Sequence, residues 1–134
     1  MWRISMTDTQ LIQLAEQMLS RSYAPYSKFC VGAALLGKNG KVYTGCNIES
    51  AAFGATICAE RCALSTAVAD GCREFETIAV ISSADDYCSP CGICRQLIFE
   101  FGQDTRVLCA RNSEDYKEYK ISELLPLGFG PSNL

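Results

Sequence analysis

The sequence predicts one α/β domain spanning residues 1–134, built around a mixed sheet of five strands with helices on its faces. Three observations support this fold class. Helical segments alternate with short β-rich segments along the chain, which is typical of α/β proteins. An Asn39-Gly40 pair between two β-rich segments indicates an antiparallel hairpin in which both turn residues tolerate positive φ. Farther on, a strand, a helix and another strand follow at the spacing of a parallel crossover, so the sheet should contain both kinds of pairing.

The individual elements follow from local patterns. Thr7 and Gln10 can form a capping box, and the apolar residues after them recur at helical spacing. Residues 77–82 form an apolar run typical of a buried parallel strand. Gly71 marks the end of one helix and Pro90 the approach to another. Strands are therefore expected at residues 29–36, 41–47, 77–82, 107–110 and 116–120, helices at 7–22, 58–70, 91–101 and 122–125, and an irregular loop at 47–56.

The composition excludes several classes of protein. Hydrophobic residues make up 49% and charged residues 20% of the chain, as in globular rather than disordered proteins. The net charge of -3, with scattered basic residues, disfavours binding to nucleic acid, which needs clustered Lys and Arg. The longest apolar runs are far too short to span a bilayer. Residues 1–6 show no secretory signal, so we expect no membrane association and a cytoplasmic location.

The chain contains nine cysteines, and their odd number, the full-sized core and the missing export signal indicate free thiols in a reducing compartment. Three of them have the spacing of metal ligands. The other six are scattered among apolar or turn residues and are expected to be small buried hydrophobic side chains. These six are Cys30, Cys46, Cys62, Cys72, Cys88 and Cys109.

Two short motifs carry the chemistry, namely Cys58-Ala59-Glu60-Arg61 and Pro90-Cys91-Gly92-Ile93-Cys94-Arg95-Gln96. Cys58, Cys91 and Cys94 would supply three thiolates to one zinc ion and leave the fourth coordination position open for water. Because each motif begins a helix, two positive helix ends would face the thiolates and lower their pKa values. The alternative is a closed structural zinc site with Cys88 or Cys62 as fourth ligand. It is less favoured, because the chain has only one Cys-x-x-Cys.

Glu60 is the expected proton carrier beside that water, in the pattern of zinc-dependent nucleobase deaminases. The chain has no histidine, which excludes Ser-His and Cys-His nucleophiles and requires a carboxylate for proton transfer. A glutamate in a first helical turn can also simply interact with the helix dipole. Three thiolates make a zinc site negative, so a guanidinium that donates to the sulfur atoms would restore acidity to the water. Arg61 is favoured over Arg95 for this role, the alternative for each being a surface salt bridge.

With these motifs in view, the sequence resembles the small homotetrameric cytidine deaminases with three cysteine ligands, from about Gln10 to the carboxyl end. The resemblance is carried by five motifs in order: Tyr23-Ala24-Pro25-Tyr26-Ser27-Lys28-Phe29, Val31-Gly32-Ala33-Ala34-Leu35, Gly45-Cys46-Asn47-Ile48-Glu49 and the two cysteine motifs. It implies a three-layer α/β/α fold, one zinc ion per subunit, and hydrolytic deamination of cytidine and 2′-deoxycytidine in pyrimidine salvage.

The resemblance also implies roles for individual residues. Glu60 would shuttle the proton. Asn47 and Glu49 would bind the ribose hydroxyls, and Phe29, which the pattern alone places in the core, would stack on the pyrimidine. Neighbouring subunits would complete each site. The implied substrate contacts are Phe29, Asn47, Glu49, Ala59, Phe53 and Phe129.

The chain departs from the family pattern at two positions. Phe53 stands where tyrosine is common, and Cys62 where threonine is common. The missing tyrosine hydroxyl removes one expected sugar contact, with a cost of about 1 kcal/mol if a hydrogen bond is lost. Three other functions remain open: a deaminase for blasticidin, a free base or a nucleotide; a non-enzymatic zinc module that binds a protein; and, with least support, an enzyme that edits nucleic acid.

Overall fold

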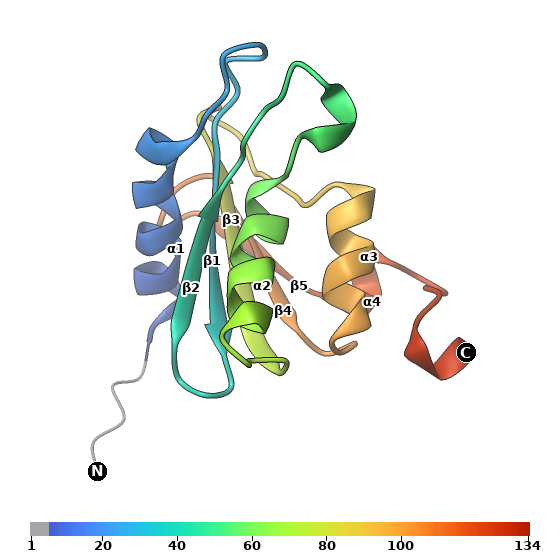
Figure 1. Cartoon of the computed structure of the whole chain (residues 1–134). Helices are drawn as coiled ribbons and strands as arrows, with labels where there is room; N and C mark the ends of the chain where they lie inside the picture. The colour runs from blue at the N-terminus through green and yellow to red at the C-terminus, as the bar shows by residue number, and fades with distance from the viewer. Residues whose placement is uncertain (1–5) are drawn as a thin grey trace.

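A computed structural model describes residues 6–134 of the chain (Figure 1). The expectation that residues 1–6 carry no export signal therefore falls, apart from Met6, outside the described residues. The fold is a five-stranded sheet of strand order β2-β1-β3-β4-β5 with helices on its faces. The strands are β1 Val31–Gly37, β2 Val42–Cys46, β3 Phe75–Ser82, β4 Arg106–Ala110 and β5 Tyr116–Lys120, and the α-helices are α1 Asp8–Gln17, α2 Ala59–Ala69, α3 Gly92–Glu100 and α4 Ile121–Leu124.

The first helix begins as the sequence predicts and ends earlier. Thr7 caps α1 with the expected box, since its hydroxyl accepts from the Gln10 N–H and the Gln10 side chain accepts from the Thr7 N–H. The α-helix stops at Gln17, and Met18–Arg21 form a 3-10 turn instead. Beyond it, the Tyr23 N–H donates to the Asn47 carbonyl, so the chain turns toward β2 rather than extending the helix.

The expected hairpin joins β1 to β2, but only one of its turn residues has positive φ. Gly40 has a φ of 84°, whereas Asn39 is not among the residues with positive φ. The turn closes through hydrogen bonds from the Gly37 N–H to the Lys41 carbonyl and from the Gly40 N–H to the Gly37 carbonyl. It is therefore a longer turn that ends in a left-handed glycine, not the two-residue turn that Asn-Gly favours.

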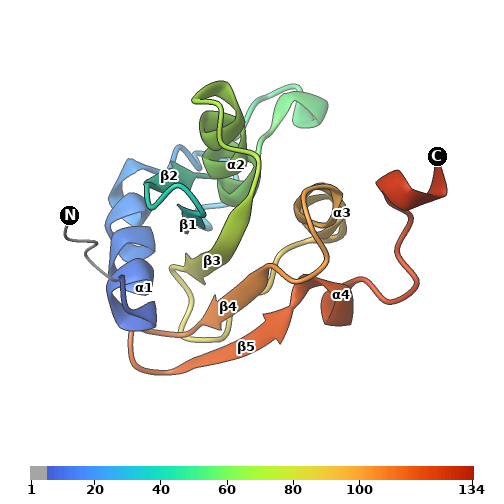
Figure 2. The ribbon, with the colours of Figure 1, turned by 90° about the horizontal axis from the view of Figure 1, so that it is seen from below.

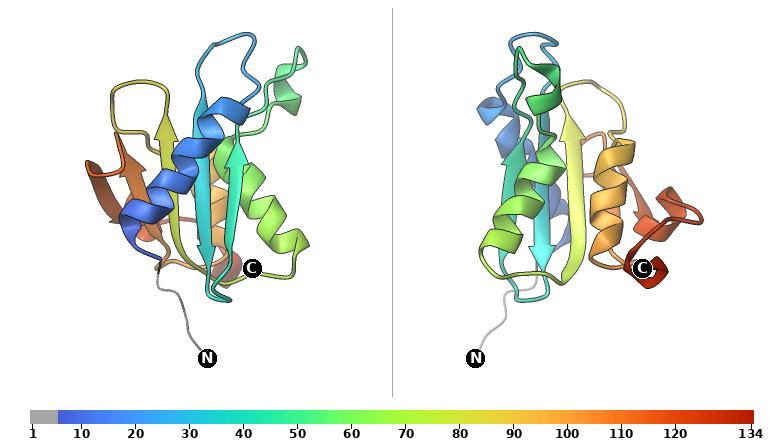
Figure 3. Two further views of the ribbon diagram at one scale, coloured as in Figure 1. Left: turned by 90° about the vertical axis from the view of Figure 1, so that its left-hand side faces the viewer. Right: turned by 45° about the vertical axis from the view of Figure 1, so that its right-hand side comes forward.

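The sheet is mixed, as predicted. Strand β1 pairs antiparallel with both β2 and β3, β3 pairs parallel with β4, and β4 pairs antiparallel with β5. Helix α1 covers one face, and α2 and α3 cover the other (Figures 2 and 3). Each face has its own buried cluster, one with Leu11 and Ile12 of α1 and one with Ala63 and Leu64 of α2. These layers confirm the three-layer α/β/α fold.

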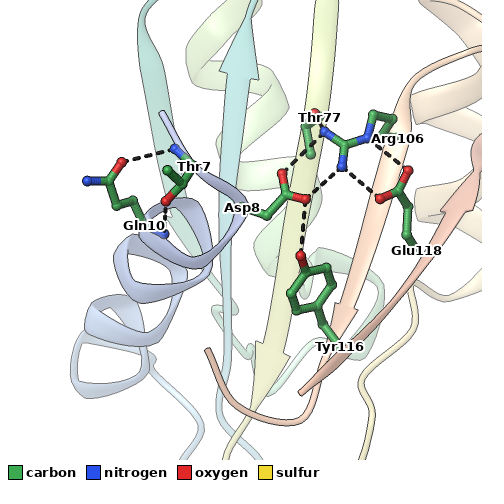
Figure 4. A network of polar contacts seen from close by, with 7 residues as sticks. All are labelled: Thr7, Asp8, Gln10, Thr77, Arg106, Tyr116 and Glu118. Carbon is green, nitrogen blue, oxygen red and sulfur yellow. Dashed lines mark hydrogen bonds and ion pairs between the residues drawn. The ribbon is translucent and has the colours of Figure 1, made fainter. Parts of the chain in front are cut away.

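Two packing features fix the helices against the sheet. A Cβ atom added at Gly45 of β2 would lie 2.4 Å from the Ala59 carbonyl oxygen and 2.5 Å from the Ala63 nitrogen, so α2 packs directly on the strand backbone. On the other face, Arg106 of β4 donates to Asp8 at the start of α1 and to Glu118 of β5 (Figure 4). Within residues 6–134, no helix is both long enough and apolar enough to cross a bilayer.

Candidate active site

The three cysteines with ligand spacing lie where α2 and α3 begin. Cys58 is the N-cap residue of α2 and Cys91 that of α3, so each helix starts one residue later than predicted. Cys94 lies in the first turn of α3 and is fully buried. The three sulfur atoms lie within 4.8 Å of one another, with 3.7 Å between the Cys58 and Cys91 Sγ atoms and 3.5 Å between those of Cys91 and Cys94.

This arrangement fits a zinc ion. Sulfur atoms about 2.3 Å from a tetrahedral zinc lie about 3.8 Å from each other, close to the two separations found here. Within the described part of the chain, the cluster holds three cysteines, and neither Cys62 nor Cys88 belongs to it. The donor set thus matches three thiolate ligands with a fourth position left for a non-protein ligand, and it gives no support to the closed structural site.

The charges of the thiols depend on one another and on Arg61. Hydrogen bonding from Cys94, and then from Arg61 and Cys91, lowers the pKa of Cys58 to about 5. Donation to Cys58, together with burial, raises the pKa of Cys94. The site therefore already stabilises one thiolate, and a bound dication would favour deprotonation of the others.

The two arginines next to the ligands behave differently. Arg61 Nη2 lies 3.7 Å from Cys58 Sγ and donates to the Thr56 carbonyl at 3.2 Å, while its Nε is buried without a partner. Arg95 donates to the carbonyls of Pro90 and Leu124 and not to a sulfur atom. Only Arg61 therefore has the geometry expected of a residue that withdraws charge from the metal site, and Arg95 supports the backbone around α3 and α4.

Glu60 follows Cys58 in the first turn of α2 and is only 5% exposed. Burial is the main cause that raises its pKa above the ordinary value. Glu60 borders the same cavity as Cys58 and Cys91. A carboxyl group with a raised pKa, next to a metal site and a cavity, suits a residue that accepts and returns a proton.

The cavity beside the thiols has a volume of about 230 Å³. Cys88 and Ser89 form part of its wall. The sequence interpretation considers Cys88 only as a fourth metal ligand or a core residue and does not single out Ser89. Their position directly before Pro90-Cys91 in the sequence could have indicated that they lie beside the metal ligands. The remaining lining residues are Phe29, Val31, Asn47, Thr56, Ile57, Cys58, Ala59, Glu60 and Cys91. A larger hollow of about 540 Å³ lies at the opposite end of the sheet, around Phe75 and Thr105, and none of the three thiols borders it.

Three of the expected substrate contacts border the cavity. Phe29 precedes β1, is 40% exposed and lines the cavity, so the core position suggested by its neighbours is wrong. Ala59 is fully buried at the start of α2. Asn47 also borders the cavity, and its side chain donates to the Phe29 carbonyl at 2.8 Å and accepts from the Val31 N–H at 2.9 Å. Its amide thus holds the segment that carries Phe29.

The other three expected contacts do not border the cavity of a single chain. The carboxylate of Glu49 accepts hydrogen bonds from the N–H groups of Tyr26 and Ser27 and from the Ser27 hydroxyl, which lower its pKa. Phe53 lies in a short 3-10 turn within the loop that was expected to be irregular and is 80% exposed. Phe129, near the carboxyl end, is 58% exposed.

All nine cysteines are free thiols in the structure, as expected. Cys46, Cys72 and Cys109 are buried, in agreement with their predicted role as small core residues. Cys30, Cys62 and Cys88 are only partly buried, which corrects the prediction for these three. They lie on loops and on a helix face, where the hydrophobicity of neighbouring residues in the sequence does not determine burial.

Comparison with known proteins identifies the family. The family described as "Cytidine and deoxycytidylate deaminase zinc-binding region" matches residues 5–110. A cytidine deaminase of Sporosarcina psychrophila is 43% identical over 126 residues, which cover 93% of both chains. A cytidine deaminase of Halalkalibacterium halodurans is 46% identical over 120 residues, covering 89% of this chain and 91% of that protein.

Two further comparisons bear on the fold and the substrate. The crystal structure of cytidine deaminase from Burkholderia pseudomallei superposes with a TM-score of 0.87 at 43% identity, covering 92% of this chain and 100% of that one. A blasticidin-S deaminase of Bacillus cereus is 33% identical over 136 aligned residues, which cover 96% of both chains. The match over most of the sequence, the shared fold and the three-cysteine cluster show that this chain belongs to the cytidine and deoxycytidylate deaminase family of zinc-binding proteins.

Proposed function

We propose that this protein is a zinc-dependent hydrolase that converts cytidine and 2′-deoxycytidine to uridine and 2′-deoxyuridine with release of ammonia. The observation that carries the proposal is a cluster of three thiols, two of which border a cavity that the buried residue Glu60 also borders. The similarity to proteins named cytidine deaminase agrees with this chemistry.

In the proposed mechanism, Cys58, Cys91 and Cys94 hold the zinc ion, which when bound supplies Lewis-acid activation of water. Glu60 accepts a proton from the water that attacks C4 of the pyrimidine and delivers it to ring N3. It then takes the second proton from the oxygen that has added to C4 and delivers it to the amino group. The C4–N bond breaks, and the group leaves as ammonia. Burial of Glu60 favours this role, because a raised pKa brings the carboxyl group closer to the pH at which it must both accept and release a proton.

The cavity lining favours a nucleoside without phosphate. The lining residues include no lysine or arginine that could balance a phosphate group. We propose that Phe29 stacks on the pyrimidine and that Ala59 and Asn47 contact the base and the sugar. A role of Glu49 at the ribose requires the carboxylate to keep its bonds to the loop of Tyr26 and Ser27 and to use a remaining lone pair, which its four acceptor sites allow.

We further propose that the protein forms a homotetramer in which neighbouring subunits complete each site. Pockets for small ligands usually have volumes of about 300 to 1,000 Å³, and the cavity of one chain is smaller, at about 230 Å³. Phe53 and Phe129 are large, exposed apolar side chains suited to contacts across such an interface. The free thiols favour a cytoplasmic location, and the substrates suggest a role in pyrimidine salvage.

Ultraviolet absorbance with cytidine, deoxycytidine, cytosine, deoxycytidine monophosphate and blasticidin S as substrates tests the proposal, together with the zinc content of the purified protein. We expect turnover of the two nucleosides and one zinc per chain. The Glu60→Gln variant should retain zinc and lose at least about 100-fold in turnover, the lower range for general acid–base catalysis. If blasticidin S were the one compound turned over, the proposed substrates would be wrong. If Glu60→Gln kept the wild-type turnover, Glu60 would not be the residue that transfers the proton.

A further inference from the structure

The loop of residues 83–91 forms one wall of the cavity without regular structure of its own. It connects β3 to α3 and contains no helix or strand. Cys88, Ser89 and Cys91 from this loop border the cavity. The position of the wall therefore depends on contacts between the loop and its surroundings. Ser83 and Cys30 exchange hydrogen bonds at one end of the loop, and Arg95 donates to the Pro90 carbonyl at the other. The middle of the loop contacts the end of β4, the turn between β4 and β5, and β5. Figure 3 shows the loop and this turn at the same end of the sheet.

We propose that Tyr87 is a positioning residue of the active site, whose hydrogen bond to Asp115 holds the loop against the β4–β5 turn and so fixes the cavity wall at Cys88 and Ser89. The inference rests on the proposed function, because it concerns the binding of substrate in that cavity. Tyr87 does not itself border the cavity and acts through its neighbour Cys88.

Three contacts around Tyr87 join the loop to the end of β4, to the turn and to β5. The Tyr87 hydroxyl donates to Asp115 Oδ1 at 2.7 Å in a partly buried position. The Lys117 ammonium lies 4.6 Å from the centre of the Tyr87 ring, within the range of a cation–π interaction. The next residue, Cys88, donates its N–H to the Ala110 carbonyl at 3.2 Å. These contacts lie within one residue of the cavity wall.

The second side-chain link between loop and turn is weaker. Arg111 donates to both carboxylate oxygens of Asp85, at 2.8 and 3.1 Å. The side chain of Asp85 is 84% exposed and that of Arg111 41% exposed, so water and salt screen this pair. Asp115 also raises the pKa of Tyr87, which keeps the hydroxyl protonated as a donor. The hydrogen bond of Tyr87 is therefore the better shielded of the two side-chain links between the loop and the turn.

The state of Cys88 reports the position of the loop independently of catalysis. Its thiol lines the cavity and has a pKa raised to about 12, mainly by burial. A loop that moves away from the turn would expose this thiol to water, lower its pKa and speed its alkylation. Cys62, which is also partly buried, lies on α2 outside the loop and serves as an internal standard in the same sample.

The test compares Tyr87→Phe with Tyr116→Phe in zinc-loaded protein. Tyr116 donates its hydroxyl to Asp8 Oδ2 at 3.2 Å on the opposite face of the sheet, so each variant loses one bond from a tyrosine to a carboxylate (Figure 4). For Tyr87→Phe we expect KM for cytidine to rise about fivefold, the change that corresponds to one hydrogen bond, with kcat within about twofold. Alkylation of Cys88 by iodoacetamide, followed by peptide mass spectrometry, should become at least about threefold faster. Tyr116→Phe should change neither value.

Asp115→Asn provides the conservative variant, because its amide oxygen can still accept from Tyr87, whereas Asp115→Ala cannot. We expect the asparagine variant to stay closer to wild type in KM and in Cys88 alkylation than the alanine variant. Unchanged Cys88 alkylation in both Tyr87→Phe and Asp115→Ala would overturn the proposal. If the wild-type protein fails to deaminate cytidine, the proposed function fails, and the alkylation rates still decide whether Tyr87 holds the loop.

Discussion

Replacing Arg61 by alanine should weaken zinc binding. The Nη2 atom of Arg61 lies 3.7 Å from Cys58 Sγ, and no other arginine of the described chain donates to a ligand sulfur. At this separation two unit charges attract by about 4 kcal/mol when the effective dielectric constant is about 20. Part of this attraction offsets the desolvation of the guanidinium group. Loss of a residue that supports metal ligands typically lowers metal affinity by about 10- to 100-fold, which corresponds to about 1.4 to 2.7 kcal/mol and fits within the Coulomb value.

The assay is a zinc competition titration with a chelator of known affinity, on wild type, Arg61→Ala, Arg61→Lys and Arg95→Ala. Arg95→Ala is the matched control, because it removes a guanidinium group beside a ligand cysteine that donates to carbonyls only. Arg61→Lys keeps the charge but loses the planar fork and should lie between wild type and alanine. Turnover with saturating zinc should fall in Arg61→Ala as well, since the site keeps its excess negative charge.

An equal zinc affinity of wild type and Arg61→Ala would refute the reasoning, because a charge at this distance from a ligand must change the free energy of the metal site. An equal loss of zinc affinity in Arg95→Ala and Arg61→Ala would also refute it. The effect would then come from helix stability and not from the contact with sulfur.

Two further predictions concern stability. Gly45→Ala should lower the free energy of unfolding by about 1 to 3 kcal/mol in chemical denaturation, because the added Cβ would meet the backbone of α2. Gly54→Ala is the control and should be near neutral, because a Cβ added there meets nothing within 4 Å. Equal stability of the two variants would contradict this reasoning. Thermal unfolding should show a loss of stability as the pH falls below about 4.5, because Arg106 lowers the pKa of Glu118, and Tyr43 and Lys41 lower that of Asp70. The unfolded chain then binds more protons than the folded one, so Glu118→Gln should flatten this slope, and an unchanged slope would exclude the contribution of Glu118.

Local chemistry made much of the site predictable from sequence. Cys58, Cys91 and Cys94 could be assigned together because their spacing and their positions at helix starts depend on a few neighbouring residues. The same holds for the Thr7 capping box and for Gly71, whose φ of 90° ends α2 as expected. The alternation of helices and strands also predicted the mixed sheet, since few connections satisfy it.

The features that the sequence did not predict depend on contacts between distant segments. The wall at Cys88 is set by Ala110 and Asp115, which follow it by more than twenty residues. The hydrogen bonds from Tyr26 and Ser27 to Glu49 could not be predicted from the residues that neighbour Glu49 in the sequence. Residue type therefore identified the three thiols that cluster and the buried carboxyl residue next to them. It did not reveal the groups that hold them in place.

Cys58 and Cys91 also occupy positions with a structural consequence. Both are N-cap residues, and neither makes the side-chain hydrogen bond by which serine, threonine or aspartate usually closes the first turn. A cation bound to both sulfur atoms would act as a common cap that joins the beginnings of two helices. Metal loading and local folding at this end of the molecule are then one coupled equilibrium, and a chelator would fray α2 and α3 together.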